Sequence, residues 1–245
     1  MNHEEKLKRD LITAENNSAW QATLEGDYPR ALEIFNVVLR RAASLGATQN
    51  RGITRLLAGD AEGALIDFMS TRSFGPSNRN AIFIGTALWL NHRQHLACKD
   101  WEYEIEQLWL KNIVYSDAAG GVLPAALLWW GSAHSGFHMY KDVAEQQLKR
   151  LKQTQRCRCN WPGPVASFIL GDIDENDFLA SAGGSAYAQI NLRRQCQAQF
   201  YIGATYLADG DEEGYKNQLQ KGLAEGSNIS DAEYHLAHYE LKHHF

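Results

Sequence analysis

The sequence has few cysteines, no long apolar run and no excess of positive charge. A chain of 245 residues can bury a substantial core without disulfides, and its four cysteines suit a reducing compartment as free thiols. The most apolar stretch, residues 120–133, is too short to cross a bilayer. Residues 1–10 are charged and lack the apolar core of a signal peptide. These absences predict a cytoplasmic protein that does not bind a membrane.

Positive charge is in slight deficit. The chain has 24 lysines and arginines against 29 aspartates and glutamates, which gives a formal net charge of -5. That balance provides no general basic field for nucleic acid, so nucleic acid is not an expected partner. The one basic stretch, residues 149–158, is interpreted as a solvated helix end, because cations favour the carboxyl ends of helices.

Proline is also scarce, with five in the chain, and the spacing of apolar residues predicts helices. Apolar residues recur three and four positions apart almost throughout, and no segment sustains the alternation of a strand. Turn signals, among them Leu45-Gly46 and Gly171-Asp172, divide the chain into segments of about a dozen residues, a typical helix length. The sequence therefore predicts an all-α fold.

A short phrase recurs at a fixed period. Gly26-Asp27 and Gly59-Asp60 each begin a ten-residue segment that ends in phenylalanine. In such a pair, glycine adopts the left-handed conformation that ends one helix, and aspartate caps the next. A period of about this size indicates stacked helical repeats. Two series are spaced by 33 residues: Ala31, Ala64 and Ala97, and Phe35, Phe68 and Trp101.

This pattern resembles the tetratricopeptide repeat, a helix-turn-helix unit. In that family a small residue lies midway along the first helix, where the two helices approach closely. The matching positions here are Ala19, Gly52 and Gly85. The resemblance implies an all-α right-handed superhelix, or α-solenoid, of antiparallel helix hairpins with about 12–13 helices. Sel1-like repeats, which have longer loops, are an alternative.

The regular period covers only part of the chain. We expect one helical repeat domain over residues 1–245. Its regular repeats occupy about 12–114, and an irregular middle follows over 115–194. A returning repeat and a polar capping helix complete it over 195–245. Long irregular segments often carry function, so the middle is a second place to look for activity.

In the resembled family, the first helices of the repeats line a concave groove. Trp20, Trp89 and Trp129 map to groove positions, and aromatic anchors are typical binding hot spots. The alternative is that these rings fill gaps between irregular units. The polar residues that map to the same inner line are Asn16, Thr23, Gln49, Arg79 and Thr86. An arginine there would pair with a carboxylate of the partner.

Motifs of catalysis and cofactor binding are absent. The chain has neither a phosphate-binding loop nor a nucleophile elbow, so no cofactor and no enzymatic activity are expected. His134 and His138 have the spacing of metal ligands on a helix, and Cys157 and Cys159 are separated by one residue. We interpret both pairs as not bound to metal. The exposed face of a final helix is expected to hold His235, His238, His243 and His244.

The sequence predicts a non-enzymatic protein-protein interaction module that binds a protein or peptide in its groove. A bacterial adaptor, a chaperone or an immunity protein would fit this description. Family members that clamp chaperone carboxyl termini use lysine and asparagine at fixed inner positions, and Asn16 and Trp20 do not reproduce that pattern. Two alternatives remain: an enzyme or a metal or small-ligand sensor that uses the irregular middle, and a self-associating scaffold that forms homo-oligomers.

Overall fold

The computed structural model describes residues 3–72, 81–115, 117–224 and 228–245. Within these ranges it contains 14 α-helices and no strand, which confirms the all-α prediction and slightly exceeds the predicted number of helices. Helix packing divides the chain into two compact units, Met1–Gly75 (unit 1) and Pro76–Phe245 (unit 2). That both belong to a single repeat domain stays a prediction.

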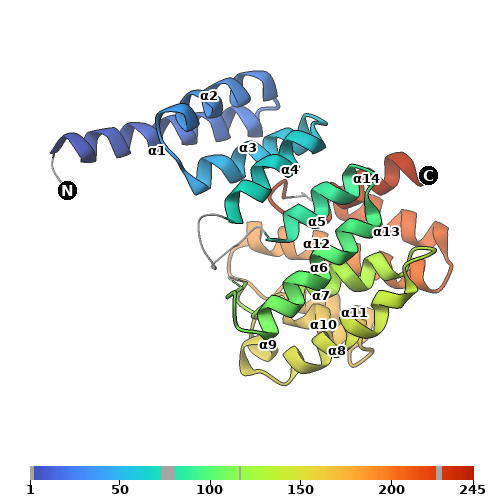
Figure 1. Ribbon diagram of the computed structural model, residues 1–245. Helices are drawn as coiled ribbons and strands as arrows, with labels where there is room; N and C mark the ends of the chain where they lie inside the picture. The colour runs from blue at the N-terminus through green and yellow to red at the C-terminus, as the bar shows by residue number, and fades with distance from the viewer. Residues whose placement is uncertain (1–2, 73–80, 116, 225–227) are drawn as a thin grey trace. The chain divides into compact units, whose positions relative to one another are not determined.

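Unit 1 consists of two helix hairpins, drawn from blue to cyan in Figure 1. α1 (His3–Leu24) packs against α2 (Tyr28–Arg41), and α3 (Leu45–Leu57) packs against α4 (Ala61–Thr71). α2 also packs against α3, so the hairpins share one core.

A buried carboxylate fixes α4 on α3. Asp67 is 1% exposed and accepts hydrogen bonds from Arg51 Nη2 at 2.6 Å and Arg55 Nη1 at 3.0 Å. Arg51 also donates to Asn36 Oδ1 on α2 at 2.7 Å. The two guanidinium groups offset the cost of burying the carboxylate, so this network joins three helices of unit 1.

The Gly-Asp turns have the conformations that the sequence predicts. Gly26, Gly59 and Gly210 have φ angles of 80°, 81° and 80°, in the left-handed region that favours glycine. The aspartate after each of them accepts a hydrogen bond from a backbone N–H of the next helix. These bonds join Asp27 to Arg30, Asp60 to Gly63 and Asp211 to Gly214.

Two other turn positions differ from the sequence expectation. His92 lies 33 residues after Gly59 and has a φ of 58°, so the left-handed turn recurs there without glycine. The turn predicted at Leu45-Gly46 is instead the start of α3, because Ser44 Oγ accepts from the Ala47 N–H and caps the helix. The repeat thus persists in the backbone where the residue type has changed.

At two of the small residues predicted to lie at helix crossings, an aromatic ring of the second helix packs directly against the backbone of the first. A Cβ atom added to Gly52 would lie 2.6 Å from Phe68 Cε1. One added to Gly85 would lie 2.3 Å from Trp101 Nε1. The interpretation of Gly52 and Gly85 as close-approach positions is therefore confirmed.

Replacing Gly52 with alanine should destabilise unit 1 by about 1–3 kcal/mol, because the fully buried Phe68 ring has to move away from the new methyl group. Gly46→Ala is the control. It lies on the same helix, and a Cβ there meets nothing within 4 Å. This control should stabilise the protein by a few tenths of a kcal/mol to about 1 kcal/mol. Urea unfolding followed by far-ultraviolet circular dichroism measures both, and equal effects would contradict the steric argument.

Unit 2 holds the remaining helices, and consecutive ones again pack as hairpins: α5 on α6, α7 on α8 and α12 on α13. No helix in the described part of the chain is both long and apolar enough to cross a membrane. The helices are α5 (Ala81–Leu90), α6 (Gln94–Trp109), α7 (Val122–Ser132), η2 (His138–Tyr140, a 3-10 turn), α8 (Lys141–Lys152), α9 (Gln155–Cys159), α10 (Gly163–Ile169), α11 (Glu175–Ala182), α12 (Ala188–Ala208), α13 (Glu212–Ala224) and α14 (Ala232–His243).

α14 makes the contact that departs most from a repeat array. In a solenoid each repeat contacts only its neighbours. Here α14 packs against α5 as well as against α12 and α13, although α5 and α14 lie at opposite ends of unit 2 in sequence. Unit 2 therefore contains packing between helices that are distant in the chain.

One face of the final helix, α14, is consequently buried, whereas a capping helix was expected to be polar and exposed. Glu233, His235 and Glu240 are all under 5% exposed, so the prediction that His235 lies on an exposed face is wrong. His238, His243 and His244 are exposed, as expected. The difference arises because α5, α12 and α13 cover one face of α14.

Basic residues in the stretch 149–158 have local partners. Lys149 pairs with Glu145 at 3.2 Å, Lys152 pairs with Asp172 at 2.5 Å, and the Arg150 guanidinium lies 3.5 Å from the centre of the Trp109 ring. Lys149, Arg150 and Lys152 belong to the last turn of α8. The interpretation as a helix end is thus confirmed for residues 149–152, whereas residues 155–158 belong to the next helix, α9.

Candidate functional site

Three tryptophans meet in the core of unit 2. Trp89 on α5, Trp101 on α6 and Trp130 on α7 are each at most 1% exposed. The ring centres of Trp89 and Trp130 are 4.5 Å apart, and those of Trp89 and Trp101 are 5.9 Å apart. α5 and α7 are rich in apolar residues and largely buried, which brings these rings together at the centre of the unit.

The Glu240 carboxylate of α14 reaches this cluster and is 3% exposed. Trp89 Nε1 donates to Glu240 Oε1 at 3.0 Å, and His134 Nε2 lies 3.1 Å from Oε2. The Tyr215 hydroxyl accepts from Trp130 Nε1 at 2.9 Å and is hydrogen-bonded to Glu240 in turn. Burial and the adjacent carboxylate raise the pKa of Tyr215 well above its usual value, so this hydroxyl remains a donor.

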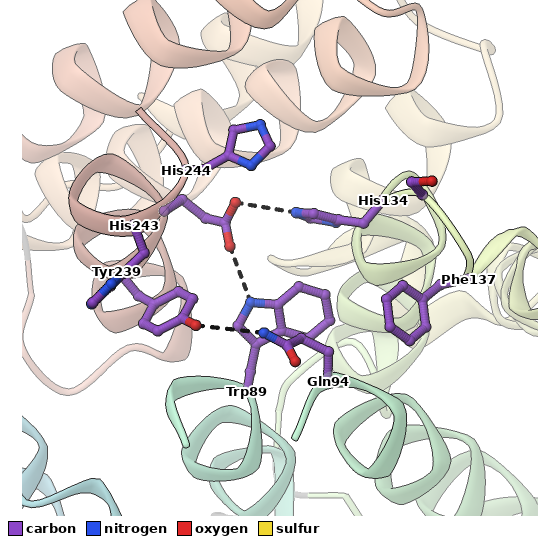
Figure 2. A pocket seen from close by; sticks show the side chains of 9 residues that line it. Trp89, Gln94, His134, Phe137, Tyr239, His243 and His244 are labelled. Atoms are coloured by element: carbon purple, nitrogen blue, oxygen red, sulfur yellow. Dashed lines mark hydrogen bonds and ion pairs between the residues drawn. The ribbon is translucent and has the colours of Figure 1, made fainter. Parts of the chain in front are cut away.

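This carboxylate lines a pocket of about 280 Å³. Figure 2 shows the pocket from close by, with most of its lining side chains labelled. Gln94 Nε2 donates to the Tyr239 hydroxyl at 3.4 Å, and that hydroxyl lies 2.7 Å from His92 Nδ1. The lining combines aromatic rings with groups that form hydrogen bonds. Its residues are Trp89, Gln94, His134, Ser135, Phe137, Tyr239, Glu240, His243 and His244.

Three of the residues predicted to line a groove lie in the described part of unit 2, and all three are buried. Thr86 is fully buried and donates to the Ile82 carbonyl, while Trp89 and Trp129 are 1% and 5% exposed. The expectation that Thr86, Trp89 and Trp129 lie on an open groove surface is therefore wrong. Other helices cover these faces of α5 and α7, although Trp89 still lines the pocket.

In unit 1, the predicted residues are divided between packing and surface. Thr23 is 2% exposed, and its hydroxyl lies 2.8 Å from that of Thr54 on α3. Asn16 and Trp20 on α1 and Gln49 on α3 are half-buried. Their role in partner binding stays a prediction.

The one remaining predicted site residue, Arg79, lies outside the described residues.

The histidines and cysteines of the irregular middle lie in different surroundings in the described part of the chain. No group of three or more metal-ligating side chains occurs in the described ranges. Cys157 is 2% exposed, and burial raises the pKa of its thiol to about 11, which leaves it unreactive at neutral pH. Cys159 and His138 are exposed, and His134 is committed to Glu240.

Sequence reasoning missed most of this pocket. Gln94, Phe137, Tyr239 and Glu240 belong to no motif, and the helix that carries the last two was expected to be a polar cap. The only local signal was the density of histidines near the carboxyl end. The contact between α14 and α5 brings Glu240 to Trp89 across 151 residues, a separation that no sequence period reports.

No protein-family model matches the chain, and no curated protein matches its sequence. The resemblance to tetratricopeptide repeats therefore rests on the residues themselves.

Proposed function

We propose that this chain is a non-enzymatic helical-repeat protein of the tetratricopeptide-like class, in which hairpins arranged as a right-handed α-solenoid bind a protein or peptide partner. The supporting observation is a contact between a glycine and an aromatic ring that recurs in two successive hairpins. Gly52 meets Phe68, and 33 residues later Gly85 meets Trp101. Arrays of such hairpins present extended surfaces, which serve binding more often than catalysis.

The binding surface is assigned to the first helices of unit 1. Asn16 and Trp20 lie one turn apart on α1 and thus share a face of that helix. Asn50 Nδ2 on α3 is 3.4 Å from Asn16 Oδ1, so the amides of the two helices adjoin at this surface. A half-buried indole offers a partner apolar area and an N–H donor, and neighbouring amides can pair with a peptide backbone.

The setting that we assign to this activity is the cytoplasm, where the protein would act as an adaptor, a chaperone or an immunity protein. The net charge of -5 disfavours nucleic acid as the partner, and the proposal includes no cofactor.

The proposal is tested by substituting Trp20 with alanine. Tagged wild-type and variant proteins are used to isolate partners from lysate, with chemical cross-linking and mass spectrometry to locate the contacts. Trp20→Ala should reduce recovery of a specific partner about tenfold or more, because truncated aromatic anchors cost more than 1 kcal/mol. Trp109→Ala is the control, since Trp109 is 41% exposed but lies on unit 2. Equal recovery with both variants, or cross-links that avoid α1 and α3, would refute the assignment.

A further inference from the structure

We propose that the pocket in unit 2 lined by α5, the start of α6, the turn after α7 and α14 binds a small organic cation, with an ammonium group held between the Glu240 carboxylate and the aromatic rings of the lining. This site is separate from the surface assigned to partner binding in unit 1, and it concerns a small ligand rather than a protein. The two proposals therefore stand or fail independently.

The charges of the lining favour a cation. Glu240 is the one carboxylate among the nine lining residues, and none of them is lysine or arginine. An anion would have to approach this carboxylate with only the imidazoles of His134, His243 and His244 to compensate. A cation meets the carboxylate directly in a confined space where solvent screening is reduced.

Glu240 retains room for one more donor. An ionised carboxylate offers about four lone-pair directions for hydrogen bonds. The side chains of Trp89, His134 and Tyr215 occupy three of them. A ligand N–H can take the fourth, whereas a fully alkylated ammonium interacts with the same oxygen through charge alone.

The aromatic rings of the pocket supply the second attraction. Phe137 and Tyr239 are half-buried, and the centres of the Trp89 and Phe137 rings are 6.0 Å apart. Phe137 is positioned by the turn after α7, in which Gly136 has a φ of 88°. Figure 2 shows Phe137 and Tyr239 on opposite sides of Trp89. Aromatic faces carry partial negative charge and attract ammonium groups within about 6 Å.

The pocket is small for a ligand site. Its volume of about 280 Å³ lies just below the range of about 300–1,000 Å³ for pockets that hold drug-sized molecules. The fitting ligand is accordingly a single head group, such as a trimethylammonium or alkylammonium group, with any remaining part of the molecule outside.

Isothermal titration calorimetry on the full chain tests this proposal with choline chloride and its neutral isostere, 3,3-dimethyl-1-butanol. Choline should bind about tenfold or more tightly than the isostere, because only the cation gains from the carboxylate and the rings. Sodium acetate should produce no binding heat. Absence of choline binding at about 10 mM ligand, equal affinity for the isostere, or preferential binding of acetate would overturn the proposal.

Variants at the edge of the pocket locate the site without disturbing the buried network. Phe137→Leu should weaken choline binding about three- to tenfold, because it removes a ring face and keeps an apolar side chain. Tyr187→Leu removes an exposed aromatic ring outside the pocket and should bind choline like the wild type. Tryptophan fluorescence verifies that each variant is folded. If a folded Phe137→Leu variant binds choline as well as the wild type does, the cation does not occupy this pocket.

Discussion

Replacing Glu240 with alanine is expected to destabilise unit 2 by about 3–5 kcal/mol, because it removes a buried acceptor shared by three donors. The indole N–H of Trp89, the imidazole of His134 and the hydroxyl of Tyr215 would all lose their partner in a site that water reaches poorly. The substitution also removes a connection among α5, α7, α13 and α14. Glu240→Gln should cost less, since its amide oxygen can still accept some of these bonds.

Urea unfolding followed by tryptophan fluorescence measures this loss, because every tryptophan except Trp20 lies in unit 2. Glu213→Ala is the matched control. Glu213 is an exposed glutamate on α13 whose hydrogen bond, from Asn217, is 3.4 Å long, and its replacement should change stability by less than about 0.5 kcal/mol. A loss below about 1 kcal/mol for Glu240→Ala would show that the network does not hold these helices together.

Acidification should destabilise unit 2 through His235 by up to about 3 kcal/mol between pH 6.5 and pH 4. His235 is 4% exposed, and its Nε2 lies 2.8 Å from the Ile229 carbonyl oxygen. Burial lowers the pKa of His235 from 6.5 to about 4. Because the pKa is depressed in the folded state, the stabilising contribution is complete above pH 6.5. It is lost as the pH falls toward 4 and the unfolded chain takes up the proton first.

The contribution of His235 to this pH dependence is isolated by comparing the wild type with His235→Gln, a variant that retains a side-chain donor for the Ile229 carbonyl. Burial raises the pKa of Asp231 and Glu233, which makes these carboxyls respond to pH in the opposite sense. They are present in both proteins, so their effect cancels in the difference. The free energy of unfolding of the wild type, relative to that of the variant, should fall by about 3 kcal/mol over this range. Parallel pH profiles would contradict the assignment of a buried neutral imidazole.

The hairpins were predictable from sequence because their determinants are local. The left-handed glycine at position 59 and the cap at Asp60 are fixed by neighbouring residues. The close contact of Gly52 with Phe68 also falls within one hairpin, so its spacing appears as a period in the sequence. Helix spacing, turns and close approaches all repeat along the chain, and each repetition strengthens the signal.

The candidate pocket was not predictable in this way. Trp89 was expected on an open groove because its repeat position implied one, and a periodic pattern assumes that only neighbouring repeats are in contact. α14 packs against α5 instead, and it buries the ring against Glu240. Nothing in the residues near Glu240 indicated that its partners would be an indole on α5 and an imidazole that follows α7.

The sequence by itself determined the all-α class, the helix hairpins, their Gly-Asp turns and the small residues at their crossings, because each depends on interactions within a few turns of helix. Only the tertiary structure decided which faces of those helices are covered. The contact of α14 with α5 changed Trp89 from a surface residue into a buried one and created the pocket beside Glu240. Such contacts depend on the mutual fit of distant helices, which leaves no period in the chain.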